Sequence, residues 1–220
     1  MYEVELKFPV RDPHDAWQRL SALGAATAAT VEEVDWYFAH PSRHFALTDE
    51  ALRIRSVAAG NTLTYKGPVI DAHAKMRREI EVPFEAGEPA RERMTHLLAA
   101  LGFQPVRRVL KWRRWGTLHW QGTALRWTWD EVPPLGEFVE LELVVEEGQQ
   151  EAARDLLCGL AELLAFGPPE KRSYLELLLA ADRRQGDVPS EEEQPVGARP
   201  RHKEQEPEQP GGNSPSVGRA

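Results

Sequence analysis

The stretch Glu3-Val4-Glu5-Leu6-Lys7, near the start of the chain, alternates strictly between charged and apolar residues. This period of two predicts a β-strand, because successive side chains of a strand point to opposite faces. One face of the strand is then purely ionic and the other purely apolar. A half-buried strand ordinarily shows such charges to solvent, where they also discourage aggregation. Taken alone, this stretch therefore favours a solvated edge strand.

The same alternation recurs along the chain and predicts further strands. In segment 51–57 two arginines share one face, and segment 138–145 mirrors the opening stretch with two glutamates. The predicted strands are 3–8, 31–39, 51–57, 63–66, 75–82, 104–115, 117–130 and 138–145, with a tight turn at Gly116 between the sixth and the seventh. From capping residues and apolar spacing, the predicted helices are 13–24, 88–101, 149–166 and 173–181.

Charged residues on the ionic faces cluster by sign, and two arrangements are open. If these faces looked outward, the sheet would pack its apolar face on the helices as an α+β sandwich. If the antiparallel strands closed on themselves, the same faces would line a polar tunnel with the helices packed on the outside. The clustering favours the second arrangement, an α+β fold with an eight-stranded closed antiparallel barrel. The acids are Glu3, Glu5, Glu79, Glu81, Asp130, Glu140 and Glu142, and the bases are Lys7, Arg53, Arg55, Lys66, Lys75, Arg77, Lys111, Arg113 and Arg126.

Such a tunnel needs a ligand that satisfies both sets of charges. Carboxylates are costly to bury unpaired, and ligand sets made only of oxygen favour hard divalent cations such as Mg²⁺ or Mn²⁺. Lysines and arginines favour a group with many anionic oxygens. A metal-bound polyphosphate meets both demands, whereas the seven histidines show no ligand spacing for zinc. The sequence contains no P-loop, nucleophile elbow or CxxC motif.

Composition limits the class of protein. The 220 residues, 41% of them hydrophobic, suffice for one domain with a sizeable core. A net charge of -8 argues against a general affinity for nucleic acid or anionic membrane. No apolar run approaches the roughly 18 residues that span a bilayer, so we expect a cytoplasmic protein. The single cysteine, Cys158, excludes an internal disulfide.

The composition changes at Arg183, after which the chain contains no aromatic residue, leucine or isoleucine. Proline, glutamate and glutamine are frequent there instead. Such a segment cannot bury enough apolar surface to offset its chain entropy. We therefore expect one folded domain over residues 1–182 and a disordered tail over residues 183–220.

The opening Glu3-x-Glu5-x-Lys7 resembles the signature of the CYTH superfamily, the triphosphate tunnel metalloenzymes. Later stretches fit in the right order over about residues 1–180, and within the superfamily they are most similar to class IV adenylate cyclases. One departure is Ala39, where related cyclase-like sequences tend to have an acid before His-Pro. The later stretches are Asp35-Trp36-Tyr37-Phe38, Leu52-Arg53-Ile54-Arg55, Thr64-Tyr65-Lys66-Gly67, Arg77-Arg78-Glu79-Ile80-Glu81, Lys111-x-Arg113, Asp130 and Leu135-Gly136-Glu137-Phe138-Val139-Glu140-Leu141-Glu142.

The resemblance implies an eight-stranded tunnel that binds a nucleoside triphosphate or another organic triphosphate, and it makes a homodimer plausible. The carboxylates implied to hold Mg²⁺ or Mn²⁺ are Glu3, Glu5, Asp130, Glu140 and Glu142, with help from Glu79 or Glu81. The bases implied to grip the phosphates are Lys7, Arg53, Arg55, Lys66, Lys111 and Arg113.

Further candidates come from the same ionic faces. Lys75, Arg77 and Arg126 join the bases that would bind the substrate. The candidates for a direct part in catalysis are Lys7, Lys66, Lys111 and Arg113. Trp36 is a candidate contact for the organic group, although such an aromatic residue more often packs in the core.

Three functions remain open, with the first narrowly favoured. In a class IV-type adenylate cyclase, the ribose 3′ oxygen attacks the α-phosphorus of ATP and pyrophosphate leaves. In a triphosphatase, a metal-activated water attacks the terminal phosphorus of inorganic triphosphate, thiamine triphosphate or a nucleotide. Both reactions use the same tunnel. The third function, polyphosphate binding without turnover, is disfavoured because a binder does not need so many metal ligands.

Overall fold

Eight strands and five helices make up the part of the chain that the structure, a computed structural model, describes: residues 2–26, 29–68 and 77–186. The strands are β1 (Tyr2–Val10), β2 (Val31–Ala39), β3 (Ala51–Val57), β4 (Gly60–Lys66), β5 (Glu79–Phe84), β6 (Gln104–Trp120), β7 (Thr123–Val132) and β8 (Gly136–Val145). The helices are α1 (Pro13–Ala22), α2 (Phe45–Thr48), α3 (Glu88–Ala100), α4 (Gln150–Leu163) and α5 (Tyr174–Gln185). Within these described residues, no helix is both long and apolar enough to cross a membrane.

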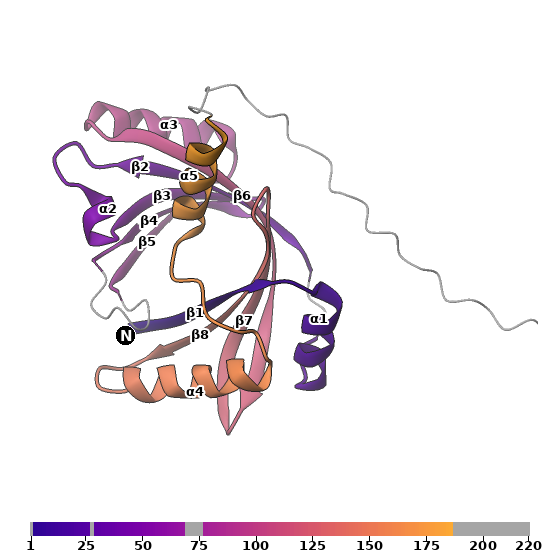
Figure 1. Ribbon diagram of the computed structural model, residues 1–220. Helices are drawn as coiled ribbons and strands as arrows, with labels where there is room; N and C mark the ends of the chain where they lie inside the picture. The colour runs from indigo at the N-terminus through magenta and orange to yellow at the C-terminus, as the bar shows by residue number, and fades with distance from the viewer. Residues whose placement is uncertain (1, 27–28, 69–76, 187–220) are drawn as a thin grey trace, which may run out of the picture. The chain divides into compact units, whose positions relative to one another are not determined.

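All eight strands belong to one antiparallel sheet, which curls strongly (Figure 1). Neighbouring strands follow the order β1-β8-β7-β6-β2-β3-β4-β5. The first and last long strands pair along their whole length, from Tyr2 opposite Val145 to Val10 opposite Glu137. The α+β class and the eight antiparallel strands predicted from the alternation are therefore confirmed.

The sheet is open, which differs from the closed barrel that the sequence predicted. β1 and β5 are the two ends of the strand order, and no backbone pairing joins them in the described part of the chain. The connection between α4 and α5 takes part of the free edge of β1, because the N–H of Glu170 donates to the carbonyl oxygen of Lys7 at 2.7 Å. Figure 1 shows this connection passing β1 on its way to α5. It occupies hydrogen-bonding groups that a closed barrel would give to β5.

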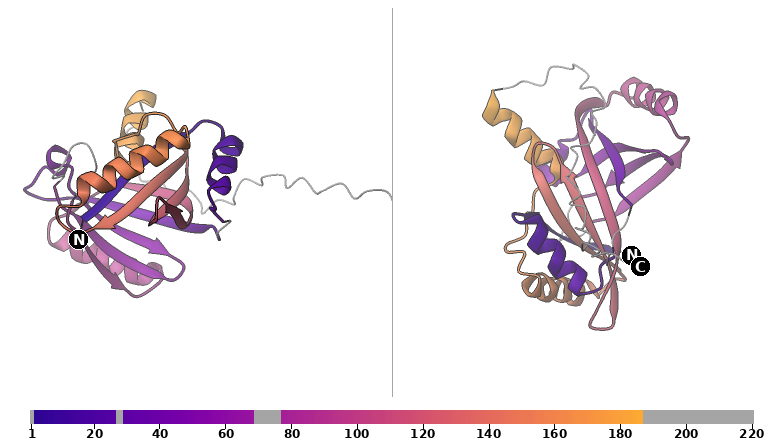
Figure 2. Two further views of the ribbon diagram at one scale, coloured as in Figure 1. Left: turned by 90° about the horizontal axis from the view of Figure 1, so that it is seen from below. Right: turned by 90° about the vertical axis from the view of Figure 1, so that its right-hand side faces the viewer.

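Helices cover the apolar outer face of the sheet, as the alternation predicts (Figure 2). Leu6 and Phe8 of β1 and Trp127 of β7 are buried in one cluster with residues of α1 and α4. In the other half of the sheet, Ile54 of β3 forms a second cluster with Leu98 of α3. The ionic faces of the strands consequently point to the inside of the curl.

Helix α5 is an exception, because it packs on the inner face of the sheet. Leu178 of α5 lies in one buried cluster with Val109 of β6 and Phe138 of β8. Two residues further along, the same strand faces carry Lys111 and Glu140, so the inner face is apolar at one end and ionic beyond it. The apolar end gives α5 its packing surface, and Figure 1 shows the helix at that end of the curl. The prediction that all helices lie outside the barrel is wrong for α5.

Strand β6 runs through Gly116, where the sequence predicted a tight turn. The chain reverses instead at Gln121 and Gly122, whose φ values of 48° and 79° suit a type I′ hairpin turn. Gly116 meets a different requirement, because a Cβ atom there would lie 2.9 Å from Nε1 of Trp127 on the neighbouring strand. The glycine makes room for an indole ring, and β6 extends over 17 residues.

Several further boundaries differ from the prediction: β4 begins at Gly60 and not at residue 63, α4 ends at Leu163 and not at residue 166, and the short helix α2 has no predicted counterpart. The fifth strand covers Glu79–Phe84 and not 75–82, the first two residues of which lie outside the described part. Helix α5 continues to Gln185, past the predicted domain boundary, and ends where Gly186 adopts the left-handed conformation with a φ of 73°. Residues 187–220 lie outside the described part, so disorder of the tail stays a prediction.

We predict that Gly116→Ala lowers the free energy of unfolding by about 1–3 kcal/mol, because the added methyl group overpacks the indole of Trp127. Gly159, inside α4, offers a matched control, since a Cβ atom there would meet nothing within 4 Å. Gly159→Ala should raise the free energy of unfolding by up to about 1 kcal/mol, because alanine is the better helix former. Urea unfolding measures both changes, and similar effects of the two substitutions would contradict this explanation of Gly116.

Candidate active site

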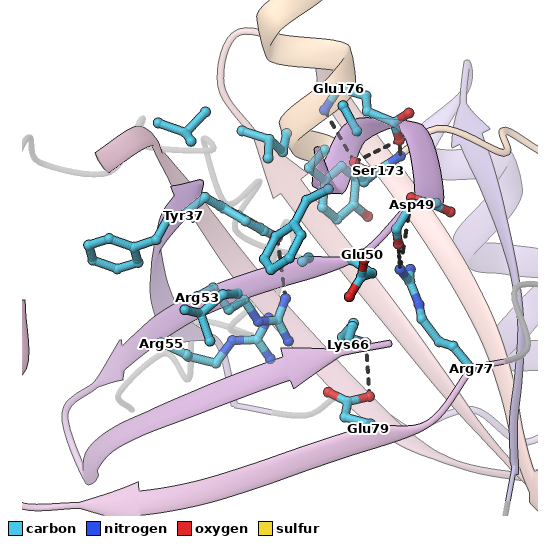
Figure 3. Close-up of a pocket in the computed structure, with 18 of the residues that line it drawn as sticks. Tyr37, Asp49, Glu50, Arg53, Arg55, Lys66, Arg77, Glu79, Ser173 and Glu176 are labelled. Atoms are coloured by element: carbon cyan, nitrogen blue, oxygen red, sulfur yellow. Dashed lines mark hydrogen bonds and ion pairs between the residues drawn. The ribbon is translucent and has the colours of Figure 1, made fainter. Parts of the chain in front are cut away.

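A cavity of about 750 Å³ lies inside the curl of the sheet (Figure 3). The inner faces of the strands line most of it, and residues of α2 and α5 complete one end. The predicted site residues that line it are Glu3, Glu5, Lys7, Arg53, Arg55, Lys66, Arg77, Glu79, Glu81, Lys111, Arg113, Arg126, Glu140 and Glu142. Asp130 is fully buried at 0% exposure behind this lining, and Lys75 lies outside the described residues.

Three glutamates of β1 and β8 form the acidic side of the cavity. Glu5 lies directly opposite Glu142 in the strand pairing, and Glu3 shares the same face of β1. Burial raises the pKa of Glu3 to about 8; Lys66 opposes this shift, and Glu5 adds to it. Burial also raises the pKa of Glu142, against the effect of Arg126. At Glu3 and Glu142 the effect of burial thus outweighs that of the nearby positive charge.

Side chains bridge the seam between β1 and β5. Lys66 of β4 pairs with Glu79 of β5, with Nζ 3.0 Å from Oε2 (Figure 3). Although burial opposes it, the pKa of Glu79 is lowered by Lys66 and by a hydrogen bond from Glu3. Such a bond requires Glu3 to be protonated, since an ionised carboxylate only accepts. The contact between Glu3 and Glu79 thus spans the seam, and the charge of Lys66 acts on both carboxyls from the β4 side.

The acidic side fits a divalent cation in its chemistry. Carboxylate oxygens suit Mg²⁺ and Mn²⁺. The raised pKa values of Glu3 and Glu142 mark carboxyls whose ionised form a bound cation would stabilise. Over the described ranges, however, no three or more His, Cys, Asp or Glu side chains already stand close enough to coordinate an ion. A bound cation would have to draw these carboxylates together and displace the proton of Glu3.

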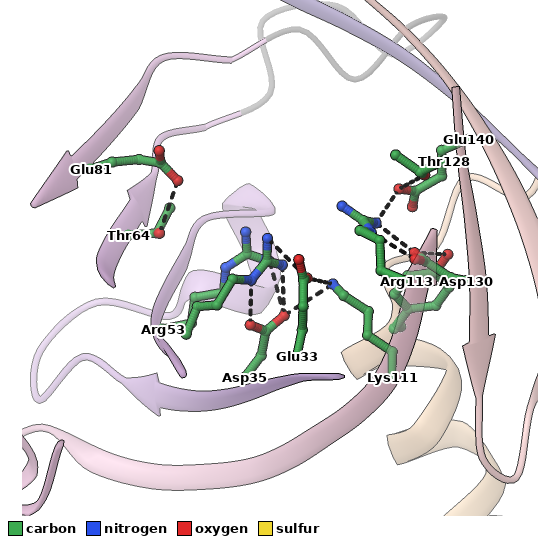
Figure 4. A network of polar contacts seen from close by, with 12 residues as sticks. Glu33, Asp35, Arg53, Thr64, Glu81, Lys111, Arg113, Thr128, Asp130 and Glu140 are labelled. Carbon is green, nitrogen blue, oxygen red and sulfur yellow. Dashed lines mark hydrogen bonds and ion pairs between the residues drawn. The ribbon is translucent and has the colours of Figure 1, made fainter. Parts of the chain in front are cut away.

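Asp35 of β2 holds the cationic wall together, although the sequence analysis gave it no site role. Its carboxylate is 1% exposed and accepts hydrogen bonds from Arg53 at 3.2 Å, Arg55 at 2.7 Å and Lys111 at 3.3 Å. Glu33, on the same strand face, lies 3.2 Å from Arg55 and 3.1 Å from Lys111. Burial opposes ionisation, but the cations, led by Arg53, hold the pKa of Asp35 well below its usual range. Figure 4 shows the network they form.

Arg113 is fixed by two carboxylates at the next part of the wall (Figure 4). Its Nε donates to Asp130 at 2.6 Å and its Nη2 to Glu140 at 2.5 Å. The hydroxyl of Tyr174 in α5 also donates to Asp130, at 2.9 Å. Although burial opposes it, Arg113 and then Lys7 lower the pKa of Glu140 to about 2. Asp130, predicted to bind metal, thus has two partners behind the cavity wall.

The segment that leads into α5 contacts two predicted catalytic lysines. Nζ of Lys7 donates to the carbonyl oxygen of Arg172 at 2.5 Å and lies 4.4 Å from the ring centroid of Tyr174. Nζ of Lys111 lies 5.7 Å from the same ring. The docking of α5 on the inner face therefore fixes the surroundings of both ammonium groups.

Other predicted residues reach the cavity from separate elements. Arg77 donates from Nη1 to the carbonyl oxygen of Asp49 at 2.8 Å, and Glu81 accepts from the hydroxyl of Thr64 at 3.3 Å. Arg126 of β7 faces Glu142 across the strand pairing. These side chains line the cavity, but their proposed roles toward a substrate stay predictions.

Trp36, considered as a contact for an organic group, packs on the outer face of β2. The guanidinium carbons of Arg91 and Arg108 lie 4.4 and 5.5 Å from its ring centroid. It also packs against the cluster that contains Ile54. Its position matches the packing role that is more common for such an aromatic residue.

The roles of Glu33 and Asp35 had a signal in the sequence. Both alternate with apolar residues, Val34 and Trp36, as the site residues of the other strands do. The run of aromatic residues after Asp35 obscured this pattern. Alternation on β2 alone would have placed both carboxylates on the inner face.

Known proteins resemble the chain over most of its length. The family model for the CYTH domain matches residues 1–174. A protein of Methanocaldococcus jannaschii named "Putative adenylate cyclase MJ0240" is 32% identical over 180 residues, which cover 80% of this chain and 98% of that protein.

Solved structures share the fold. The structure of PH1819 protein from Pyrococcus horikoshii OT3 is 36% identical, covers 81% of this chain and 99% of that one, and has a TM-score of 0.69. The structure of "Putative adenylyl cyclase HpAC1" from Hippeastrum, described as revealing a dominant triphosphatase activity, is 18% identical with a TM-score of 0.50. It covers 85% of this chain and 96% of that one, and at this identity the likeness concerns the fold alone.

We expect Tyr174→Phe to lower the free energy of unfolding by about 1–3 kcal/mol, because the buried Asp130 carboxylate loses a hydrogen-bond donor. The ring and its contacts with Lys7 and Lys111 remain. Tyr2→Phe, at the start of β1, is the matched control and should change the free energy by less than about 0.5 kcal/mol. Denaturant unfolding followed by tryptophan fluorescence compares the two variants. Equal effects would show that the bond to Asp130 contributes nothing.

Without a divalent cation, the protein should become less stable as the pH rises from about 4.5 to about 8, and its stability should level off above that. In the folded protein Glu3 keeps its proton up to a pKa of about 8, whereas its ordinary value is 4.5. The folded state therefore binds the extra proton between these values, and the stabilisation is lost as the pH passes the folded pKa. Glu3→Gln should flatten this part of the profile, because an amide does not titrate.

The measurement is the thermal unfolding midpoint in EDTA across this pH range. Mg²⁺ or Mn²⁺ should raise the midpoint more at the alkaline end, since a cation binds the ionised carboxyls. Glu162→Gln on the exposed side of α4 serves as the control and should keep the parental profile. A Glu3→Gln profile parallel to the parental one would refute the raised pKa.

Proposed function

Because this chain belongs to the CYTH family, we propose that it is a metal-dependent enzyme that acts on a triphosphate bound in its cavity. The observation that carries the proposal is the division of one cavity into a cationic wall and an acidic side. Asp35 and Arg113 anchor the wall, and Glu3, Glu5 and Glu142 form the acidic side. A polyphosphate together with a divalent cation satisfies both sets of charges.

We assign phosphate binding to the bases that line the cavity. Asp35 already orients Arg53 and Arg55, so their guanidinium groups lose little freedom when phosphate oxygens bind them. Burial and then Arg55 lower the pKa of Lys111, and an anion bound beside it would favour its charged form. Lys7 and Lys66 approach the same space from the two edges of the sheet. Together these side chains surround a chain of phosphates from several directions.

We assign metal binding to Glu3, Glu5 and Glu142, and to Glu79 on the other side of the seam. A divalent cation held there would neutralise charge that develops on the phosphate oxygens. For Asp130 the contacts favour another role, which is to orient Arg113 from behind the cavity wall. Glu140, whose carboxylate also accepts from Arg113, belongs to the same supporting pair.

The reaction we favour is adenylate cyclisation of the class IV type. The ribose 3′ oxygen of ATP forms a bond to the α-phosphorus, the bond from that phosphorus to the bridging oxygen breaks, and pyrophosphate leaves while the 3′ hydroxyl gives up its proton to solvent. The residues of this chain hold the triphosphate and stabilise its growing negative charge. The relative from Methanocaldococcus jannaschii, with its name and its 32% identity, supports this choice of reaction.

Triphosphate hydrolysis is the second candidate. It would use the same cavity, with water attacking the terminal phosphorus in place of the ribose oxygen. The Hippeastrum structure, described as having a dominant triphosphatase activity, has the same fold. The fold is therefore compatible with either reaction, and products must distinguish them. Binding without turnover is disfavoured because several carboxylates face the cavity alongside the bases.

Product analysis of the purified protein tests the proposal. With Mg²⁺ or Mn²⁺, we expect ATP to give cyclic AMP and pyrophosphate, whereas orthophosphate from ATP or inorganic triphosphate would support the triphosphatase. Glu142→Gln should lower turnover at least about 100-fold, because a ligand of the cation is lost. Glu162→Gln, which removes an exposed carboxylate of α4, should turn over at the parental rate. Absence of turnover with every metal and substrate would contradict both reactions.

A further inference from the structure

Trp115 of β6 faces the inside of the sheet and is still 49% exposed. Side chains of a strand alternate between faces, so Trp115 shares its face with Lys111 and Arg113, both of which line the cavity. Trp120, an odd number of positions away, packs instead against the outer core. A half-exposed indole beside the ionic part of the inner face needs an explanation.

The strand pairing places Trp115 in a row with residues of the proposed site. Trp115 lies opposite Thr128 of β7, Thr128 opposite Glu140 of β8, and Glu140 opposite Lys7 of β1. Neighbouring strands are about 4.8 Å apart, so the backbone of Trp115 is roughly 10 Å from that of Glu140. The row therefore leads from the phosphate-binding region to the indole.

Trp115 also lies at the rim of the sheet. The pairing of β2 with β6 starts at Val31 opposite Arg113, so no residue of β2 is paired with Trp115. Figure 1 shows β6 and β7 extending beyond the other strands as a hairpin. One side of the indole is consequently not covered by a neighbouring strand, although the side chain starts from the inner face of the sheet.

Arg126 connects the indole to the cavity. Its guanidinium carbon lies 4.9 Å from the ring centroid of Trp115. The same residue lies opposite Glu142 and lines the cavity. A guanidinium over an indole is a favourable pair that orients both side chains. Aromatic rings and arginines together are typical of sites where nucleobases stack.

We propose that Trp115 and Arg126 form the subsite for the planar organic group of the substrate, and that a nucleobase stacks on the exposed surface of the indole. Arg126 then contacts the part of the substrate between the base and the terminal phosphates. This inference rests on the proposed function, because it assumes that the triphosphate lies in the cavity. It adds that the substrate is a nucleotide and not inorganic triphosphate.

The other end of the cavity is the competing location. There Leu175 and Leu179 of α5 face the cavity beside Phe45 of α2. Aromatic side chains such as Tyr37, Phe45 and Tyr174 also line this end, but they are at most 8% exposed, and the packing of α5 on the sheet already uses much of the end. The indole gives a purine a larger stacking surface, so we assign the base to the Trp115 end.

Calorimetric titration of the purified protein with ATP and with inorganic tripolyphosphate tests the subsite, because the two ligands share the phosphates and differ in the nucleoside. In Trp115→Ala, the ratio of ATP affinity to tripolyphosphate affinity should fall roughly ten-fold relative to the parent. Trp115→Phe keeps a ring and should retain most of the ratio. Leu97→Ala, at a 53% exposed position of α3 on the outer side, is the control and should not change it.

An unchanged ratio in Trp115→Ala would overturn the proposal. A fall of the ratio in Leu175→Ala but not in Trp115→Ala would likewise overturn it and place the organic group at the α5 end. A parent protein that binds tripolyphosphate as tightly as ATP would show that no base subsite exists, while leaving the triphosphate cavity intact. A parent that binds neither ligand would contradict the proposed function itself.

Discussion

Three cations converge on the single buried carboxylate of Asp35, and the wall of the cavity depends on this contact. Asp35 lies opposite Arg55 in the pairing of β2 with β3, and β2 is the strand that joins β3 to β6 in the sheet. Removing one partner from such a buried network leaves charge uncompensated, at a cost of about 3–5 kcal/mol. The same contact that permits positive charge inside the curl also aims the guanidinium groups at the space where an anion would bind. The contacts of Asp35 therefore stabilise the sheet and also hold the guanidinium groups in position for a ligand.

The inner face of the sheet changes from apolar to ionic along the strands, and this change decides where α5 packs and where the cavity lies. Where the strands carry Val109 and Phe138, α5 packs on them, and two residues later the faces become ionic and form the cavity. Tyr174 stands at this boundary, with its ring beside Lys7 and its hydroxyl on Asp130. One aromatic residue thus belongs to an apolar core and also fixes charged groups. The helix that closes one end of the cavity is in this way part of the charge network of its wall.

Alternation with period two predicted the strands and most of the residues that line the cavity, because in a strand this period alone decides which side chains share a face. Alternation does not predict whether the sheet closes into a barrel. Closure depends on which segment pairs with the free edge of β1, and Glu170, which bonds there, is far from β1 in the sequence. The sequence predicts a turn at Gly116, because a glycine required by a neighbouring indole looks the same in sequence as one required by a turn. The family resemblance implies a metal role for Asp130, whereas its contact with Tyr174, which comes from another element, has no signal in local spacing.

Among the described residues, side-chain contacts, and not backbone pairs, span the open seam of the sheet. Between β1 and β5 the described chain has no main-chain hydrogen bonds, and the link consists of Glu3, Glu79 and Lys66. A separation of the two edges would therefore break no backbone pair of the described sheet. Movement there costs only side-chain contacts, which a cation could replace by coordinating both edges at once. In a closed barrel the bore is set by strand number and stagger, whereas here side-chain contacts and the connection before α5 occupy the seam.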